Sequence, residues 1–237
     1  MEKERWHSRI AAREIYRYMG MKEQDADEAL QRRVEEQLAR LLAVCRVRSF
    51  YRLFPLRIKE NRRQETASPN EGTAPLLELG PMTIASRGLA RNLRGCDQAA
   101  LFGVTLGLEA DRLIYRLGQT AVGEALITDA CAAAAIEAVC DELCETLRRE
   151  AAKAGRKIRP RFSPGFGDFT LAYQPAIFNT LELSKRIGVT LTAGGMMTPS
   201  KSVTAVVGLY KESAGKPHAP VEENITTGGL RTDESSV

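Results

Sequence analysis

Histidine and the aromatic residues are scarce in this chain. Its 237 residues include only two histidines, His7 and His218, near opposite ends, and aromatic residues make up 6%. A Ser-His-Asp or Cys-His site is therefore not expected, because it needs a histidine beside its nucleophile. The glycines around Lys201 lack the spacing of a phosphate-binding P-loop, and Gly165-x-Gly167 is too short for a dinucleotide fingerprint. The residue types favour a binding role over acid–base catalysis.

Long apolar runs are also missing. No uninterrupted apolar stretch could cross a bilayer, and the first seven residues are charged and lack the apolar core of a signal peptide. The five cysteines are an odd number, which favours free thiols in a reducing compartment. Cys140 and Cys144 have the spacing of one helical turn, but no second Cys or His pair completes a metal site, so we predict buried structural thiols. We expect a cytoplasmic protein without a membrane partner.

Charge is only mildly unbalanced, with a net charge of +4 and a pI of about 8.8. Seven of the basic residues fall in Arg46–Arg63 against one acid, Glu60, with aromatic residues between them. Three interpretations remain open: a nucleic-acid strip with stacking aromatics, a docking face for an acidic protein, and a strand with one buried and one solvated face. The strand is favoured, because a basic patch requires clustering in three dimensions. Nucleic acid is therefore not expected as a partner.

The N-terminal part has the pattern of a helical pair. Ser8 is placed to cap a first helix, and Gly20 is placed to end it. Asp25 and Glu28 have capping-box spacing and predict the start of a second helix. Apolar residues then recur at steps of three and four through Cys45, as on an amphipathic helix.

The middle of the chain alternates between short strands and helices. We predict a loop over Gln64–Pro75, because the stretch is rich in turn-forming residues. The further predictions are a strand at Met82–Ile84, a helix capped by Ser86 that ends near Gly95, a buried strand at Ala99–Leu106, and a helix at Leu108–Leu117 stopped by Gly118.

The longest predicted element is a helix over Thr120–Ala154, about 50 Å long, that ends at Gly155. Its expected inner face carries Val122, Leu126, Ala130, Ala134, Leu143 and Leu147. The alanines of 132–135 permit close approach of another element.

The C-terminal third is predicted to contain three strands and one helix. A basic strand covers Arg156–Arg161, and Pro175 suits the first turn of a helix. Strands at Ile187–Thr192 and Ser202–Leu209 are expected to pair antiparallel, because their connection is short. Lys211–Val237 is predicted to be a mobile tail.

The predicted fold class is α+β, with a curved, mostly antiparallel sheet packed on long helices and a helical pair at the N-terminus. We expect three regions: an N-terminal helical region with a basic strand-like extension (1–63), an α+β core (76–210) and the tail (211–237).

The chain is organised around Arg159–Val203. Arg161 precedes a turn that Pro164 constrains and that Gly165 and Gly167 free for unusual backbone angles. Glycine lets a ligand approach main-chain groups, and a guanidinium can hold a carboxylate or phosphate with two parallel hydrogen bonds. The local chemistry predicts an anionic or zwitterionic small molecule, whereas composition alone favours a structural salt bridge for Arg161.

These residues also carry a family resemblance. Arg161-Phe162-Ser163-Pro164-Gly165-Phe166, then Arg186-Ile187-Gly188-Val189-Thr190-Leu191-Thr192, then Pro199 and Ser202-Val203, resemble the activation domain of cobalamin-dependent methionine synthase. That family has Arg-x-x-x-Gly-Tyr followed by Arg-Ile-Gly-Val-x-Leu-Thr. The blocks occur in the family's order, and the strong part covers roughly a quarter of the chain.

The resemblance implies a ligand and residues that bind it. S-adenosylmethionine would be the ligand: Arg161 would bind its carboxylate, and Ser163 and Gly165 would supply main-chain contacts. Phe166 stands where the family has tyrosine; it could still face the sulfonium by a cation–π contact, or be a core aromatic. The family's acidic residue that meets the ligand's ammonium group has no assigned equivalent here, and Asp168 is near only in sequence.

The resemblance also implies a function in methionine biosynthesis. The chain would be a stand-alone reactivation component of a split cobalamin-dependent methionine synthase, itself a methyltransferase. It would bind S-adenosylmethionine for the reductive methylation of cob(II)alamin carried by a partner subunit, with an electron from a flavodoxin- or ferredoxin-like donor. The alternative is a module that senses S-adenosylmethionine, or docks on a corrinoid protein, without methyl transfer.

Overall fold

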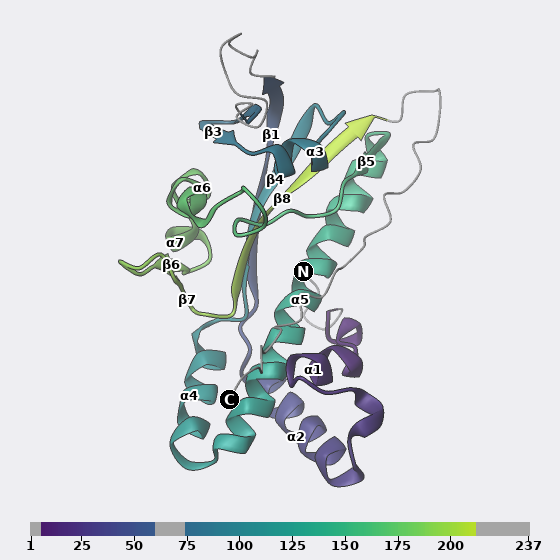
Figure 1. Ribbon diagram of the computed structural model, residues 1–237, viewed down its shortest axis with the longest axis vertical. Coiled ribbons are helices and arrows are strands. Elements are labelled where there is room, and N and C mark those ends of the chain that lie inside the picture. Colours follow the sequence, from purple (N-terminus) through teal and green to yellow (C-terminus); the bar gives the residue numbers. More distant parts are fainter. Residues whose placement is uncertain (1–5, 60–73, 212–237) are drawn as a thin grey trace, which may run out of the picture.

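The computed structural model describes residues 6–59 and 74–211. The predicted loop at 64–75 lies almost entirely, and the predicted tail after Lys211 entirely, outside the described residues. Within them the chain is a mixed α+β fold in which helices pack on both faces of one antiparallel sheet (Figure 1). The predicted fold class is therefore confirmed.

The sheet has six strands in the order β3-β2-β1-β4-β8-β5, and each neighbouring pair is antiparallel. The strands are β1 (Arg48–Lys59), β2 (Leu76–Leu79), β3 (Met82–Ala85), β4 (Gln98–Thr105), β5 (Arg156–Ile158) and β8 (Ser202–Lys211). A separate hairpin pairs β6 (Thr190–Leu191) with β7 (Met197–Thr198). The strand-like extension of the N-terminal region is β1, which pairs with β2 and β4 inside this sheet.

Side chains on the two faces of the sheet belong to two hydrophobic cores. On β4, Ala100, Phe102 and Val104 face the core formed with the long helix, while Ala99 and Leu101 face the opposite core. This alternation follows from the two-residue period of a strand. Almost every residue of β4 is buried, because helices cover it on both sides.

Seven helices and three short 3₁₀ segments are present among the described residues. The helices are α1 (Ala12–Tyr18), α2 (Glu28–Val44), α3 (Arg87–Asn92), α4 (Leu108–Thr120), α5 (Val122–Lys153), α6 (Gln174–Leu181) and α7 (Leu183–Arg186). The helices α1, α2 and α4 pack with α5 on one side of the sheet, and α6 and α7 lie on the other (Figure 1).

Helix α5 is the long element that the sequence predicted, and it extends about 48 Å over 32 residues. Gly155 follows it with a φ of +64°, a left-handed conformation that glycine adopts without strain. The predicted inner face is correct from Ala130 onward, but Val122 and Leu126 are exposed. The inner face is wrong there because α2 and α4, which pack against α5, leave these two side chains uncovered; the contact of α2 is made instead at Glu124, which pairs with Arg33.

Several predicted helix ends differ from the structure. Ser8 lies in a 3₁₀ turn, His7–Arg9, and does not cap α1. Helix α2 is capped by Asp27, whose Oδ1 accepts a hydrogen bond from Leu30 N at 2.7 Å, and not by Asp25. Gly118 lies inside α4 and does not end it, because it does not adopt the left-handed conformation of a helix-stopping glycine. Gly20 follows α1 as predicted, with a φ of +76°.

The predicted antiparallel pairing of Ile187–Thr192 with Ser202–Leu209 is wrong. β8 pairs with β4 on one side and β5 on the other, and Thr190–Leu191 pairs only with the short β7. The short connection is used by the β6–β7 hairpin, which leaves both edges of β8 free for the main sheet. The capped helix after Ser86 and the helix start at Pro175 are both confirmed.

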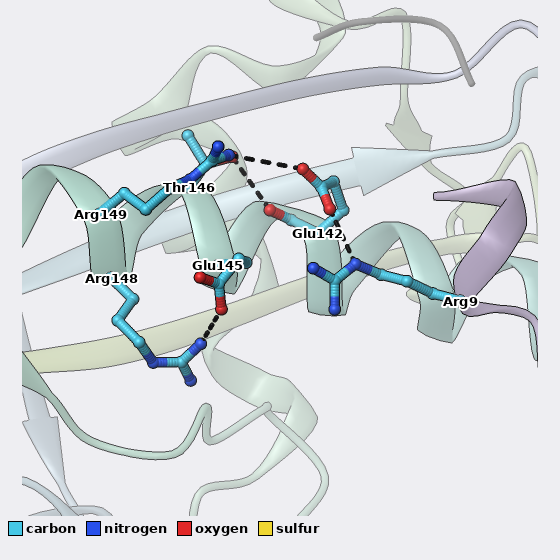
Figure 2. A network of polar contacts seen from close by, with 6 residues as sticks. All are labelled: Arg9, Glu142, Glu145, Thr146, Arg148 and Arg149. Atoms are coloured by element: carbon cyan, nitrogen blue, oxygen red, sulfur yellow. Dashed lines mark hydrogen bonds and ion pairs between the residues drawn. The ribbon is translucent and has the colours of Figure 1, made fainter. Parts of the chain in front are cut away.

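A polar network attaches the N-terminal segment to α5 (Figure 2). The Glu142 side chain is only 5% exposed and accepts a hydrogen bond from Arg9 Nε at 2.8 Å. Arg149 Nη2 lies 3.5 Å from the other carboxylate oxygen and also donates to Thr146 Oγ1. A buried carboxylate needs such partners, so the network fixes how the first turn lies on the long helix.

Candidate functional site

The loop that contains Arg161 is held against the sheet by its own backbone. Phe162 exchanges two hydrogen bonds of 2.9 Å with Val206 on β8. Gly165 N donates to Phe169 O at 2.7 Å, and closing this turn requires the φ of +101° at Gly165. The buried Phe169 ring anchors the far end of the loop. Arg161 therefore stands at the start of a fixed turn beside β8.

The Arg161 guanidinium lies between two carboxylates of α5. Its Nη2 donates a hydrogen bond to Glu137, while Nη1 is 3.1 Å from Asp141 Oδ1. The second contact is an ion pair without a hydrogen bond. Nη1 is buried, and no acceptor lies in the direction of its N–H groups. The structural salt bridge anticipated for Arg161 is present, and it places positive and negative groups side by side.

The buried thiols of α5 lie next to this ion-pair cluster. Burial raises the pKa of Cys140 and of Cys144, although the positive charge of Arg161 opposes the shift in both. Cys140 is fully buried as predicted, whereas Cys144 is only half-buried. No cluster of metal-ligating residues occurs within 6–59 and 74–211.

The other predicted ligand-binding residues lie on the same loop. Phe166 is 65% exposed, with its ring 6.2 Å from the Phe162 ring, so its interpretation as a core aromatic is wrong. Ser163 O accepts a hydrogen bond from Phe166 N at 3.3 Å, and Gly165 N is used inside the turn. Ser163 O and Gly165 N are thus already used inside the turn, while the Phe166 ring is open to solvent.

Asp168 is used to anchor the loop. Its carboxylate accepts hydrogen bonds from Ser86 Oγ at 2.5 Å, Arg87 N at 2.6 Å and Gly88 N at 3.0 Å, at the start of α3. Partial burial works to raise the pKa of Asp168, but these hydrogen bonds outweigh it and the pKa is lowered. Asp168 thus acts as a second cap of α3 and fixes the end of the loop.

Sequence reasoning missed Glu137 and Asp141. They precede Arg161 by 24 and 20 residues and meet it only because α5 runs back along the sheet. Their spacing of four residues places them on one face of the helix, next to each other. That pair of acids, one turn apart on the helix that leads into the loop, was the available signal.

The basic stretch at Arg46 is a strand, as favoured from the sequence. Phe50 and Phe54 pack against the core beneath α6 and α7, and the Arg52 guanidinium lies 5.9 Å and 6.0 Å from their ring centres. Arg186 covers Phe50 at 4.8 Å. Rings already covered by guanidinium groups and the core are poorly placed for base stacking, and residues 60–63 lie outside the described part.

Two further findings concern the rest of the described chain. A shallow hollow on α4, lined by Asp111, Arg112, Tyr115 and Arg116, shares no residue with the Arg161 loop. No helix in the described part of the chain is long and apolar enough to span a membrane. The Arg161 loop and its two acids are therefore the candidate site.

Comparison with known proteins gives a likeness to a solved structure. No protein-family model matches the sequence, and no curated protein matches it. Among solved structures, the crystal structure of the MetH reactivation domain bound to AdoHcy superposes with a TM-score of 0.61 at 18% sequence identity. The match covers 91% of this chain and 78% of that chain. At this identity the likeness establishes the fold: the chain has the fold of that reactivation domain.

Proposed function

We propose that this chain binds S-adenosylmethionine at the Arg161 loop and is a reactivation component of a split cobalamin-dependent methionine synthase. The observation that carries the proposal is the ion-pair cluster of Arg161 with Glu137 and Asp141, at the start of the loop that also exposes Phe166. It occurs in a fold like that of a reactivation domain crystallised with AdoHcy. The cluster suits a ligand that carries an amino-acid group.

The residues present fit such a ligand. An α-amino acid has a carboxylate and an ammonium group on one carbon. The cluster has the complementary charges next to each other, a guanidinium in direct contact with two carboxylates. The buried Nη1 of Arg161, which has no hydrogen-bond partner, can donate to the ligand's carboxylate. The ammonium can be accepted by an α5 carboxylate, and the open Phe166 ring can face the sulfonium.

The chemistry expected here needs positioning rather than proton transfer. The bound ligand supplies a methyl group on a positively charged sulfur, and no catalytic acid or base is required of the chain. The cobalamin would belong to a partner subunit, and a flavodoxin- or ferredoxin-like donor would supply one electron. Transfer of that electron and of the methyl cation to cob(II)alamin gives methylcobalamin and S-adenosylhomocysteine. We expect this to occur in the cytoplasm.

Calorimetric titration with S-adenosylmethionine tests ligand binding. We expect the parent to bind and Arg161→Ala to lose at least tenfold in affinity, because a charge-assisted hydrogen-bonded contact is worth about 1.5–3 kcal/mol. Arg148→Ala is the matched control, since Arg148 is an exposed arginine of α5 that pairs with Glu145. Equal affinities for the parent and Arg161→Ala would contradict this site.

A reactivation assay tests the function itself. The purified chain is mixed with the cob(II)alamin form of its corrinoid partner, a one-electron reductant and S-adenosylmethionine labelled at the methyl group. Label in methylcobalamin, dependent on the chain, is the expected result. Tight binding without any methyl transfer would instead favour a module that senses the ligand or docks on a corrinoid protein. The observation that favours this alternative is Phe166, which lacks the phenol hydroxyl of the family's tyrosine.

A further inference from the structure

The two acids at Arg161 are not equivalent. Glu137 accepts a true hydrogen bond from Nη2, whereas Asp141 is near Nη1 without one. The Asp141 side chain is also the more exposed of the two, at 59% against 41%. One edge of the guanidinium is therefore fixed to the helix, and the other is held only by charge attraction to an acid that water can readily solvate.

We propose that Asp141 is an internal counter-anion that competes with the ligand's carboxylate for the Nη1 edge of Arg161, and so sets the affinity of the site. This inference rests on the function proposed above. A ligand carboxylate at Nη1 would satisfy a buried donor that Asp141 leaves without a hydrogen bond. Asp141 would turn to solvent while Glu137 keeps the guanidinium oriented.

The proposal predicts that removing Asp141 changes the affinity for the ligand in the direction opposite to that expected from net charge. S-adenosylmethionine has a net charge of +1, so removing any nearby acid should weaken its binding if only net charge matters. Removing a competitor should strengthen it. Since exposed ion pairs are weak, the expected gain is roughly two- to fivefold.

The test is calorimetric titration of the parent, Asp141→Asn and Glu145→Gln with three ligands. Two, S-adenosylmethionine and S-adenosylhomocysteine, carry the carboxylate, and decarboxylated S-adenosylmethionine does not. Glu145→Gln is the matched control, because Glu145 lies one turn further along α5 and pairs with Arg148. Asp141→Ala, with a residue that favours helix, repeats the comparison should the asparagine disturb α5.

Tighter binding of both carboxylate-bearing ligands by the Asp141 variants, with no gain for the decarboxylated ligand or for Glu145→Gln, supports the proposal. Binding by an Asp141 variant alone supports it as well. Unchanged or weaker binding in the Asp141 variants, beside a parent that binds, overturns it and leaves the proposed function standing. No binding by any protein overturns both.

Discussion

At the scale of single residues, Asp168 links the candidate loop to the rest of the fold. Replacing it with asparagine removes the charge from a carboxylate that accepts three hydrogen bonds at the start of α3. We expect Asp168→Asn to lower the free energy of unfolding by about 1 kcal/mol, as loss of a helix cap does. Denaturant unfolding measures it.

Ser86→Ala is the partner variant for a double-mutant cycle. Ser86 Oγ donates to Asp168 and accepts from Leu89 N at 3.0 Å, so both residues serve one network. The losses of unfolding free energy in the two single variants should therefore sum to more than the loss in the double variant. Strict additivity would mean that Asp168 acts on the loop alone.

Residue patterns predicted local features well and distant contacts poorly. Ser86, Gly20 and Gly155 were correctly placed because a cap or a left-handed stop depends on neighbours within one turn. Glu137 could not be assigned, because its contact with Arg161 depends on how α5 lies against the sheet. The same limit explains the exposed Phe166, whose burial is decided by the loop and not by its residue type.

At the scale of elements, the attachment of the N-terminal turn to α5 depends on one buried carboxylate. Arg9→Ala should cost roughly 1–3 kcal/mol, because it leaves the Glu142 carboxylate without its hydrogen-bonded partner. Arg149→Ala should cost less, since Arg149 is 3.5 Å from that carboxylate. Denaturant midpoints of the two variants are the measurement, and equal losses would contradict this account.

The packing of α7 on β4 depends on the absence of a side chain at Gly103. A Cβ there would lie 2.8 Å from Leu183 Cδ2 and 3.0 Å from its Cδ1. Gly103→Ala should therefore destabilise the protein by roughly 1–3 kcal/mol through overpacking. Thermal or denaturant unfolding of the purified variant would measure the loss.

Two further variants make that result interpretable. Gly118→Ala, inside α4 with open space around it, should stabilise by about 0.5–1 kcal/mol from helix propensity. In a Leu183→Ala background, Gly103→Ala should cost much less than in the parent. An undiminished cost in that background would locate the strain elsewhere.

Element existence was easier to predict than element pairing. The strands near Met82, Ala99 and Ser202 and the long helix were all predicted from their own residues. The partner of β8 was wrong because pairing was inferred from connection length, while β8 joins β4 about a hundred residues earlier in the chain. The periodicity of a sequence shows which side chains of a strand share a face, but it does not show which other strand pairs with its edges.

At the scale of the whole molecule, stability should be greatest at intermediate pH. Hydrogen bonding from Arg156 lowers the pKa of Asp97, and the hydrogen bonds at α3 outweigh burial to lower that of Asp168. Burial raises the pKa of all five thiols, to about 12 for Cys45 and Cys131. The carboxylates therefore limit stability at low pH, and the thiols limit it at high pH.

The signs follow from proton linkage. The carboxylates contribute fully above about pH 4, and their contribution is lost as pH falls through their lowered native pKa values. The thiols contribute fully below about pH 8.5, and this is lost as pH rises toward their native pKa values. Denaturant midpoints between pH 3 and pH 10 should form a plateau with two falling limbs, and Asp97→Asn should flatten the acid limb. A midpoint that still rises above pH 9 would contradict the assignment.

The interior position of β8 in the sheet has a consequence for biosynthesis. This strand fills the gap between β4 and β5, yet it lies at the end of the described chain. During translation the sheet therefore cannot be completed until nearly all described residues have left the ribosome, and one long edge of β4 stays unpaired until then. Unpaired edges recruit other strands, so a chain released before residue 202 should be a substrate for chaperones or for aggregation.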